Sequence, residues 1–553
     1  WFPNERMMVG ADGRRMENTD PYLEFASDWA WALFDRAICS HMRGDEALAL
    51  ATARELAEVQ PKIEAECARR GFPRQKYWDS SREGKEKPYL DFLEQFPQLL
   101  SDLERRSREG DRAIVIPGEK QKITNQTERI AALIRDLDLV QARQWGQPGG
   151  VNLAEDSIME ALIQEGDAAV DPLLDCMEKD KRLTRSVGFH RDFFRDRRVI
   201  PVSSAAATAL QTILHASFRG NVAGIRAYWE KYRNLKLEDR WYAMLGDDAA
   251  SNRWLEAAGN IIQPENETTF PNGFSMRTPT PTNVPVRLRG EILRGKSNPS
   301  VADLMARRAL EVPAGDPNTY DLSAACQMGT ILAVWDVHAA GPVAQVLSRR
   351  CRTVMQYSAE DLGKFISQLA LVRAHAGDPL AFEDYAAWLP STTPEHLDNS
   401  LTECLQPLRE FPTNPMLQQA ADKTFNNTNS AWSRLPWTRT GFDDPAASAL
   451  VNLPAFRTLL VRELDRKEVR GSISLISSGM IQFEITDYMS GSRSINLPPD
   501  SQVANGTHAD LRWCDWIALS LSTGNFIPPY NPFAPIEERN AAIEKAKTLL
   551  SQK

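Results

Sequence analysis

The amino-acid sequence predicts a mainly α-helical fold, an α-solenoid of stacked helical hairpins with a small β-hairpin near the C-terminus. Apolar residues recur at three- and four-residue steps through most of the 553 residues, as on the buried face of an α-helix. Short turns such as Gly44-Asp45 and Gly377-Asp378 interrupt these runs, which is typical of helical hairpins. Around residues 471–486 the period changes to two, which indicates strands.

The composition is that of an ordinary globular protein, with 42% apolar and 25% charged residues. The formal net charge of −9 disfavours a general nucleic-acid coat, which normally carries a basic excess. No run of 18 consecutive apolar residues occurs, so the sequence predicts no membrane-spanning helix. The chain starts with Trp1 rather than Met, as after removal of a secretory signal. We therefore expect a secreted or periplasmic location, with the cytoplasm as the alternative.

The first helical hairpin is expected over residues 22–60. Gly44-Asp45 supplies its turn, and Pro61 is expected to end the second helix because proline lacks the backbone N–H that a helix interior needs. Small residues such as Ala47 and Ala51 would let the two helices approach closely.

This hairpin resembles a tetratricopeptide repeat (TPR). That family carries an early Trp in the first helix, a Gly-Asp-like turn, alanines in the second helix and a closing Pro. The residues that match are Trp29 or Trp31, Gly44-Asp45, Ala47 with Ala51, and Pro61. The pattern recurs around Gly377-Asp378, where Pro390 or Pro394 closes it, and each match covers about one repeat.

A second pattern, over residues 158–214, resembles HEAT repeats. Two short helical runs at 158–166 and 168–177 precede an alanine-rich helix at 204–214, and residues 322–347 repeat the theme. The helix, aromatic Pro-rich loop and charged helix that end the chain resemble the terminal unit of bacterial HEAT-like proteins, which caps a helical stack. The resemblance implies a divergent, bacterial, TPR-like and HEAT-like repeat protein that binds other proteins.

Pro-rich and turn-rich linkers separate the helical blocks. We expect a TPR-like helical region at 1–127, a HEAT-like region at 128–263, a Pro-rich crossover at 264–286, a helical repeat region at 287–410, an irregular linker at 411–445, and a C-terminal capping region at 446–553 that holds the β-hairpin 471–486 and terminal helices at 509–520 and 536–550.

Motifs that would fix a reaction or a cofactor are missing. The seven histidines form neither an HExxH motif nor a pair at i and i+4, and the seven cysteines form no CxxC. Neither a Walker loop, a GxGxxG loop after a strand, nor a GxSxG elbow occurs. We therefore expect neither a metal nor a cofactor. We favour a non-catalytic scaffold for protein–protein interaction or assembly over an enzyme.

The alternative is an α/α-toroid enzyme that acts on a polysaccharide or cell-envelope polymer. Carboxylates beside aromatic residues are what sugar binding and acid–base chemistry need. The candidates are Asp247 and Asp248 after Trp241-Tyr242, Asp336 after Trp335, Glu383 and Asp384 beside Tyr385, and Asp443 and Asp444 after Trp437. Asp commonly caps helices and occupies turns, and capping is the favoured interpretation of these residues.

The most basic stretch runs from Lys181 to Arg198, where seven basic and two acidic side chains give a charge of +5. We expect an inserted loop or short helix here. The candidate binding residues are Arg182, Arg185, Arg191, Arg195, Arg197, Arg198, Phe193 and Phe194. Arg clustered with aromatic residues would grip a phosphate, a carboxylate-rich partner or the acidic face of another copy. The alternative is a solvated amphipathic segment. We expect a protein partner or self-association, and consider nucleic acid an unfavoured ligand.

Overall fold

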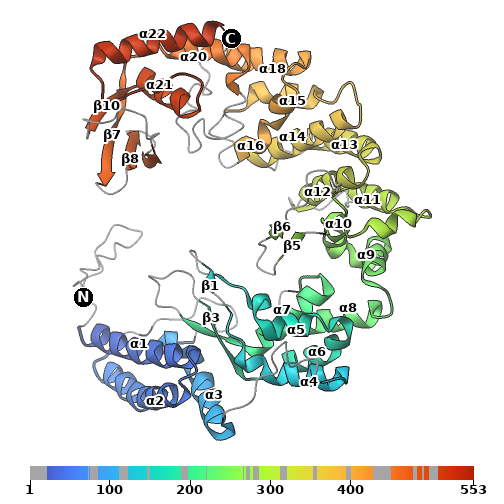
Figure 1. The fold of residues 1–553 in the computed structure, drawn as a ribbon, viewed down its shortest axis with the longest axis vertical. Coiled ribbons are helices and arrows are strands. Elements are labelled where there is room, and N and C mark those ends of the chain that lie inside the picture. Colours follow the sequence, from blue (N-terminus) through green and yellow to red (C-terminus); the bar gives the residue numbers. More distant parts are fainter. Residues whose placement is uncertain are drawn as a thin grey trace. The chain divides into compact units, whose positions relative to one another are not determined.

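The fold is described from a computed structural model of the chain. The structure describes residues 21–72, 74, 85–110, 123–142, 144–145, 150–188, 197–218, 221–265, 267–269, 275–277, 286–311, 320–352, 358–393, 400–426, 450–477, 482–487, 491–496 and 508–552. The chain divides into two compact units (Figure 1): unit 1 comprises Trp1–Arg240 and Pro264–Arg287, and unit 2 comprises Trp241–Gln263 and Leu288–Lys553. The described part of each unit is mainly helical, as the sequence predicts.

Unit 1 combines helices with short antiparallel strand pairs. Its helices are α1 (Pro21–Met42), α2 (Glu46–Arg69), α3 (Phe96–Glu109), α4 (Gln126–Arg135), α5 (Ser157–Ile163), α6 (Val170–Lys179), α7 (Val202–Leu214) and α8 (Val222–Tyr232), with 3-10 helices η1 (Asp91–Gln95), η3 (Asp136–Leu139), η4 (Leu153–Glu155) and η5 (Gly166–Ala169). Its strand pairs are β1 (Gln144–Trp145) with β2 (Gly150–Val151), β3 (Leu183–Gly188) with β4 (Arg198–Pro201), and β5 (Glu267–Thr269) with β6 (Ser275–Arg277).

The expected first hairpin forms from α1 and α2, which lie side by side (Figure 1). The expectation that Pro61 ends the second helix is wrong, because α2 continues through Pro61 to Arg69. An interior proline costs about 3 kcal/mol through its missing hydrogen bond and its ring clash. Burial offsets that cost, since Ile63 and Cys67 beyond the proline are 3% and 0% exposed and belong to the core shared with α1 and α3.

The basic stretch after α6 does not form the expected loop or short helix over its described residues. Leu183–Gly188 is strand β3, which pairs antiparallel with β4 and aligns Val187 with Val199. Leu183, Val187 and Val199 are nearly inaccessible and join the apolar core of α1, α2 and α3. Burial of each of these apolar side chains stabilises the folded chain by about 1.5–3 kcal/mol. This gain explains why the segment forms a buried strand although basic residues surround it.

Unit 2 is built mainly from consecutive helices. They are α10 (Trp254–Ile262), α11 (Val301–Leu310), α12 (Tyr320–Trp335), α13 (Val337–Cys351), α14 (Ala359–His375), α15 (Glu383–Trp388), α16 (Leu401–Cys404), α17 (Gln406–Glu410), α18 (Pro415–Phe425), α20 (Pro454–Glu463), α21 (Trp513–Thr523) and α22 (Ile536–Gln552), with η6 (Asp248–Arg253), η7 (Glu291–Gly295) and η8 (Leu389–Ser391). The boundary between the units falls within α9 (Leu237–Gly246).

The helices α11, α12, α13 and α14 pack in chain order. Within this set, each helix contacts the next, and α11 and α12 also contact the next but one. Small side chains make the close packing possible, since Ala325 of α12 and Ala340 and Ala344 of α13 are at most 1% exposed. The four helices therefore form one contiguous packed block.

The expected C-terminal hairpin is confirmed and is part of a larger sheet. Strands β7 (Val469–Ser477), β8 (Gln482–Asp487), β9 (Gly491–Asn496) and β10 (His508–Arg512) form an antiparallel sheet in the order β10-β7-β8-β9. The helix expected from Ala509 begins only at Trp513, because residues 508–512 pair with β7 instead. Asp515 then anchors α21, since it is fully buried and accepts hydrogen bonds from Arg512, Arg539 and the Tyr530 hydroxyl.

Candidate functional site

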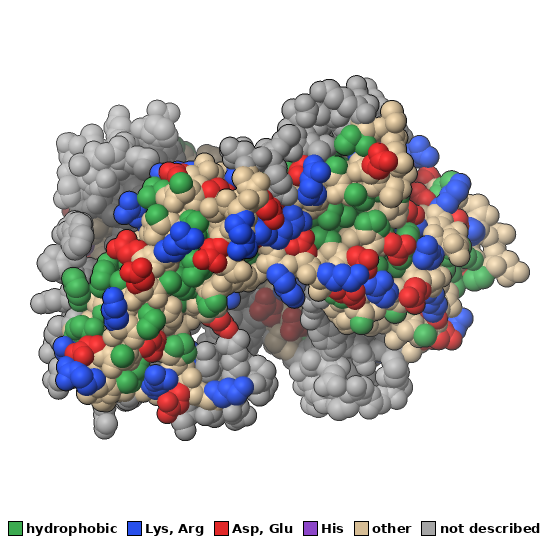
Figure 2. Space-filling view, turned by 90° about the horizontal axis from the view of Figure 1, so that it is seen from below, with side chains coloured by type: hydrophobic (Ala, Val, Ile, Leu, Met, Phe, Trp, Pro, Cys, Tyr) green, Lys and Arg blue, Asp and Glu red, His purple; other side chains and the backbone are tan. Residues whose placement is uncertain are grey.

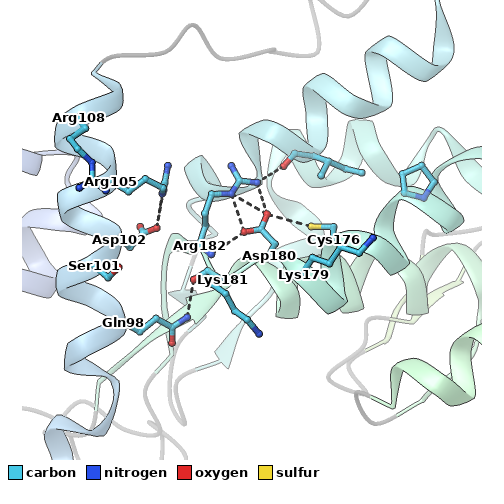
Figure 3. Close-up of a pocket in the computed structure, with 12 residues that line it drawn as sticks. Gln98, Ser101, Asp102, Arg105, Arg108, Cys176, Lys179, Asp180, Lys181 and Arg182 are labelled. Atoms are coloured by element: carbon cyan, nitrogen blue, oxygen red, sulfur yellow. Dashed lines mark hydrogen bonds and ion pairs between the residues drawn. The ribbon is translucent and has the colours of Figure 1, made fainter.

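An open groove of about 660 Å³ lies within unit 1, between α3 on one side and the turn from α6 to β3 on the other (Figure 3). It is lined by Gln98, Ser101, Asp102, Arg105, Arg108, Ile134, Pro172, Cys176, Lys179, Asp180, Lys181 and Arg182. Five of these side chains are basic and two are acidic. The face in Figure 2 carries basic and acidic side chains interspersed.

The α3 wall is one face of an amphipathic helix. Phe96, Leu99 and Leu103 pack into the core, so the residues at intervening helical positions turn toward the groove. The groove-lining residues of α3 are Gln98, Ser101, Asp102, Arg105 and Arg108, spaced three, one, three and three residues apart. Figure 3 shows them in that order along the helix.

The opposite wall is a tight turn held by Asp180. Its Oδ1 accepts the backbone N–H of Arg182 at 2.9 Å, and both carboxylate oxygens accept the Arg182 Nε at 3.0 Å. The Gln98 Nε2 donates to the Lys181 carbonyl at 3.0 Å and so joins the two walls at one end of the groove (Figure 3). The turn therefore has a fixed position relative to α3.

Two of the lining arginines are occupied by bonds within the chain. Arg105 donates to Asp102, Glu109 and Asp138. Arg182 donates to Asp180 and to the carbonyls of Arg135 and Ile134 at 2.5 and 3.1 Å. Every nitrogen of both guanidinium groups takes part, so the charges of these two side chains are compensated within the chain and their bonds hold the walls of the groove together.

A buried carboxylate lies behind the groove. Asp138 of η3 is fully buried, and its carboxylate oxygens lie 2.9 Å from Arg105 Nη2 and 3.5 Å from Arg182 Nη1. Its carbonyl accepts a 2.7 Å hydrogen bond from Arg106, which also bonds the Leu183 carbonyl of β3. The buried charge is thus compensated from both walls, as burial of an ion requires.

Ion pairs in the groove stabilise the charged forms of Arg105 and Asp180. Burial lowers the pKa of Arg105, but its hydrogen bond to Asp102 and the charges of Asp102, Asp138 and Glu109 outweigh burial and raise the pKa. Burial likewise raises the pKa of Asp180, yet the bonds to Arg182 dominate and lower it. These groups keep their charges across the neutral range.

Burial makes the thiol in the groove a poor nucleophile. Cys176 is 7% exposed, and burial raises the pKa of its thiol to about 12, with the neighbouring Asp180 carboxylate acting in the same direction. A nucleophilic cysteine needs a lowered pKa. Cys176 therefore contributes an apolar surface to the groove rather than a reactive group.

Two cations remain available at the groove. Arg108 and Lys181 are exposed, and neither has an ion-pair partner among the residues that the structure describes. The third exposed cation, Lys179, lies 3.3 Å from Asp175. Arg108 lies in the last turn of α3, whereas Lys181 lies on the facing turn, beside Gln98 (Figure 3).

The structure distributes the predicted binding residues over several places. Arg182 lines the groove, whereas Arg185 is not among the lining residues and its guanidinium pairs with Glu46 of α2 at 3.1 Å. Arg197 precedes β4 and Arg198 begins it, and neither lines the groove. Arg191, Phe193, Phe194 and Arg195 lie outside the described residues.

Sequence reasoning missed the contribution of α3. Arg105 and Arg108 fall in the sequence Glu104-Arg-Arg-Ser-Arg-Glu109, which has the mixed charge of an ordinary exposed helix end. The sequence held one weak indication of a binding site. Three arginines lie within one turn, which is more positive charge than is needed to compensate the dipole at a helix C-terminus. Only the fold places this turn of α3 along the same groove as Lys181.

The carboxylates considered for catalysis occupy structural positions wherever they are described. Asp247 accepts from the Ala249 N–H, and Asp336 accepts from the N–H groups of His338 and Ala339 at the start of α13. These two confirm the capping interpretation. Ion pairs with arginines are formed by Asp248, Glu383 and Asp384. The last two candidates, Asp443 and Asp444, lie outside the described residues.

Comparisons with known proteins add no family to this picture: no family model, no curated protein and no solved structure matches the chain. Within the described residues, no group of three or more His, Cys, Asp or Glu side chains is placed to hold a metal ion. No helix in that part of the chain is long and apolar enough to cross a membrane.

Proposed function

We propose that this chain is a non-catalytic helical-repeat scaffold that holds a partner protein by docking an acidic segment of it in the groove of unit 1. The observation that carries the proposal is the charge distribution of the groove. Arg105, Lys179 and Arg182 have counter-ions within the chain, whereas Arg108 and Lys181 have none in the described part. Two exposed cations beside an open, rigid groove favour an anionic ligand.

The dipoles of two helices weaken the attraction of the groove for an anionic ligand but do not cancel it. Arg108 lies at the C-terminal end of α3 and Lys181 follows the C-terminal end of α6, and each such end carries about −0.5 of an elementary charge. A full positive charge on Arg108 or Lys181 exceeds this, and the dipole falls off within one turn. The groove therefore stays attractive to carboxylates.

The lining chemistry supports binding over catalysis. Both acidic residues of the groove, Asp102 and Asp180, accept hydrogen bonds from arginines, and burial keeps the Cys176 thiol protonated. A general acid or base needs a carboxylate that exchanges its proton near neutral pH, and an arginine partner works against that. Docking asks only for fixed walls and complementary charge.

The helical packing supports the scaffold part of the proposal. The α1–α2 hairpin of unit 1 and the ordered packing of α11 to α14 in unit 2 are what stacked repeats use to build long binding surfaces. A repeat scaffold of this kind combines many weak contacts, of which the groove would be one.

The test measures binding of a short fluorescein-labelled peptide of alternating Asp and Leu to the full chain by fluorescence anisotropy. We expect saturable binding that weakens as salt is raised, because exposed charges are screened. The double variant R108Q/K181Q is expected to bind about tenfold more weakly, from two exposed ion pairs of about 0.7 kcal/mol each.

The matched control is K62Q/K236Q, which removes two exposed lysines outside the groove. It is expected to bind like the original chain, and circular dichroism checks that all variants keep their helices. Equal weakening by both double variants, or no binding of the acidic peptide, would refute docking in the groove.

A further inference from the structure

The two available cations of the groove lie near its opposite ends. Gln98, whose side chain bonds the Lys181 carbonyl, and Arg108 are ten residues apart on α3, which corresponds to about 15 Å along the helix axis at 1.5 Å per residue. Figure 3 shows Arg108 at one end of the labelled helix face and Gln98 at the other. A single carboxylate would meet both cations only if both side chains leaned toward the centre of the groove.

The groove centre offers few new partners to a charged ligand. Arg105 and Arg182 already donate from every nitrogen, and Ile134, Pro172 and Cys176 make one side apolar. A carboxylate placed there would lose water without gaining a comparable donor, which is unfavourable. An apolar side chain would instead gain buried area.

An extended peptide satisfies both conditions. It advances about 3.3 Å per residue, and residues i, i+2 and i+4 project from the same side. Four residue steps therefore cover about 13 Å, which matches the separation of the two ends once side-chain reach is added. A helical ligand would cover only about 6 Å in the same four steps.

We propose that the groove recognises an extended partner segment with acidic residues at positions i and i+4 and an apolar residue at i+2. One acid pairs with Arg108, the other pairs with Lys181, and the apolar side chain packs on the side formed by Ile134, Pro172 and Cys176. This inference rests on the proposed function, since it specifies which acidic segment docks in the same groove.

The experiment compares labelled peptides of identical composition that differ only in the spacing of two Asp residues around one Leu. The peptide with the acids at i and i+4 is expected to bind about three- to fivefold more tightly than peptides with spacings of one or three residues, because only it forms both ion pairs. Anisotropy titrations at constant ionic strength give the affinities.

A double-mutant cycle locates each contact. R108Q and K181Q are combined with peptides in which either Asp is replaced by Asn. We expect R108Q to have no further effect on the peptide that lacks one of the acids, and K181Q to have none on the peptide that lacks the other. Additive losses in all combinations would overturn the assigned pairing.

The outcomes separate this inference from the proposed function. Equal affinity for every spacing would overturn the i, i+4 rule and leave docking of acidic segments intact. Failure of every acidic peptide to bind would overturn docking itself. Tighter binding of a single-stranded oligonucleotide than of the i, i+4 peptide would overturn a peptide as the ligand.

Discussion

The side-chain amide of Gln95 pairs with the backbone of Val199 as a neighbouring strand would. Its Nε2 donates to the Val199 carbonyl at 2.6 Å, and its Oε1 accepts the Val199 N–H at 2.9 Å. These two bonds attach β4 to the start of α3, 104 residues earlier in the sequence. They hold together the core from which the groove walls project.

Replacing Gln95 by Ala should therefore destabilise unit 1. Val199 is fully buried, so its N–H and carbonyl would lose their partners inside the protein. We expect a loss of about 2–3 kcal/mol in the free energy of unfolding, measured by urea denaturation. Gln98→Ala is the control, since it removes a single exposed bond, and an equal loss in both variants would contradict the prediction.

Replacing Asp138 by Asn should be more costly than the same change at the surface. The neutral amide leaves Arg105 and Arg182 without their shared buried counter-ion, at a cost of about 3 kcal/mol. Asp175→Asn removes an exposed partner of Lys179 and should cost about 0.5 kcal/mol or less. Urea denaturation of the two variants measures both losses. Similar denaturation midpoints would refute the role of Asp138 as the buried counter-ion of Arg105 and Arg182.

The Asp180–Arg182 pair predicts a pH dependence. The folded-state pKa of Asp180 lies below its usual value, so the carboxylate binds protons less readily in the folded chain than in the unfolded one. Its contribution to stability is then fully present above about pH 4 and is lost as the pH falls through the lowered pKa. The difference in unfolding free energy between the original chain and Asp180→Asn should shrink below pH 4, and a constant difference from pH 7 to 3 would contradict this assignment.

Substitution of two turn glycines by Ala distinguishes the effect of backbone strain from that of a side-chain contact. Gly44 and Gly377 both have positive φ, at 77° and 85°, so Ala is strained at either position by about 1 kcal/mol. A Cβ on Gly44 would also lie 3.3 Å from the Arg185 guanidinium. A Cβ on Gly377 would have no atom of a residue other than its chain neighbours within 4 Å. Gly44→Ala should be the more destabilising variant in thermal denaturation, and equal shifts would show that Arg185 yields without cost.

Periodicity predicted α1, α2, α5, α6 and α7 because these helices bury regular apolar faces. It failed where a distant partner decides the structure. Pro61 stays inside α2 because Ile63 and Cys67 gain a core, and Leu183 to Gly188 form a strand because β4 and the α1–α3 core accept it. No local pattern carries that information.

The groove was predictable only in part, for the same reason. Arg182 was singled out from the charge of its segment, and it does line the groove. Arg108 belongs to a helix end of mixed charge, and its role follows from the wall that faces it, which lies more than 70 residues further along the sequence. The pairing of two distant segments is a tertiary property, which charge counting along the chain does not capture.

The attachment of β3 and β4 to the core of α1, α2 and α3 has a consequence for synthesis on the ribosome. The three helices leave the exit tunnel well before Val199, yet Leu183, Val187 and Val199 complete their apolar core. The nascent hairpin of α1 and α2 must therefore wait, with part of its apolar surface uncovered, until about ninety further residues have been translated after α3, which takes roughly 5–20 seconds at about 5–20 residues per second. Chaperones that shield nascent apolar surface would meet this chain in that interval.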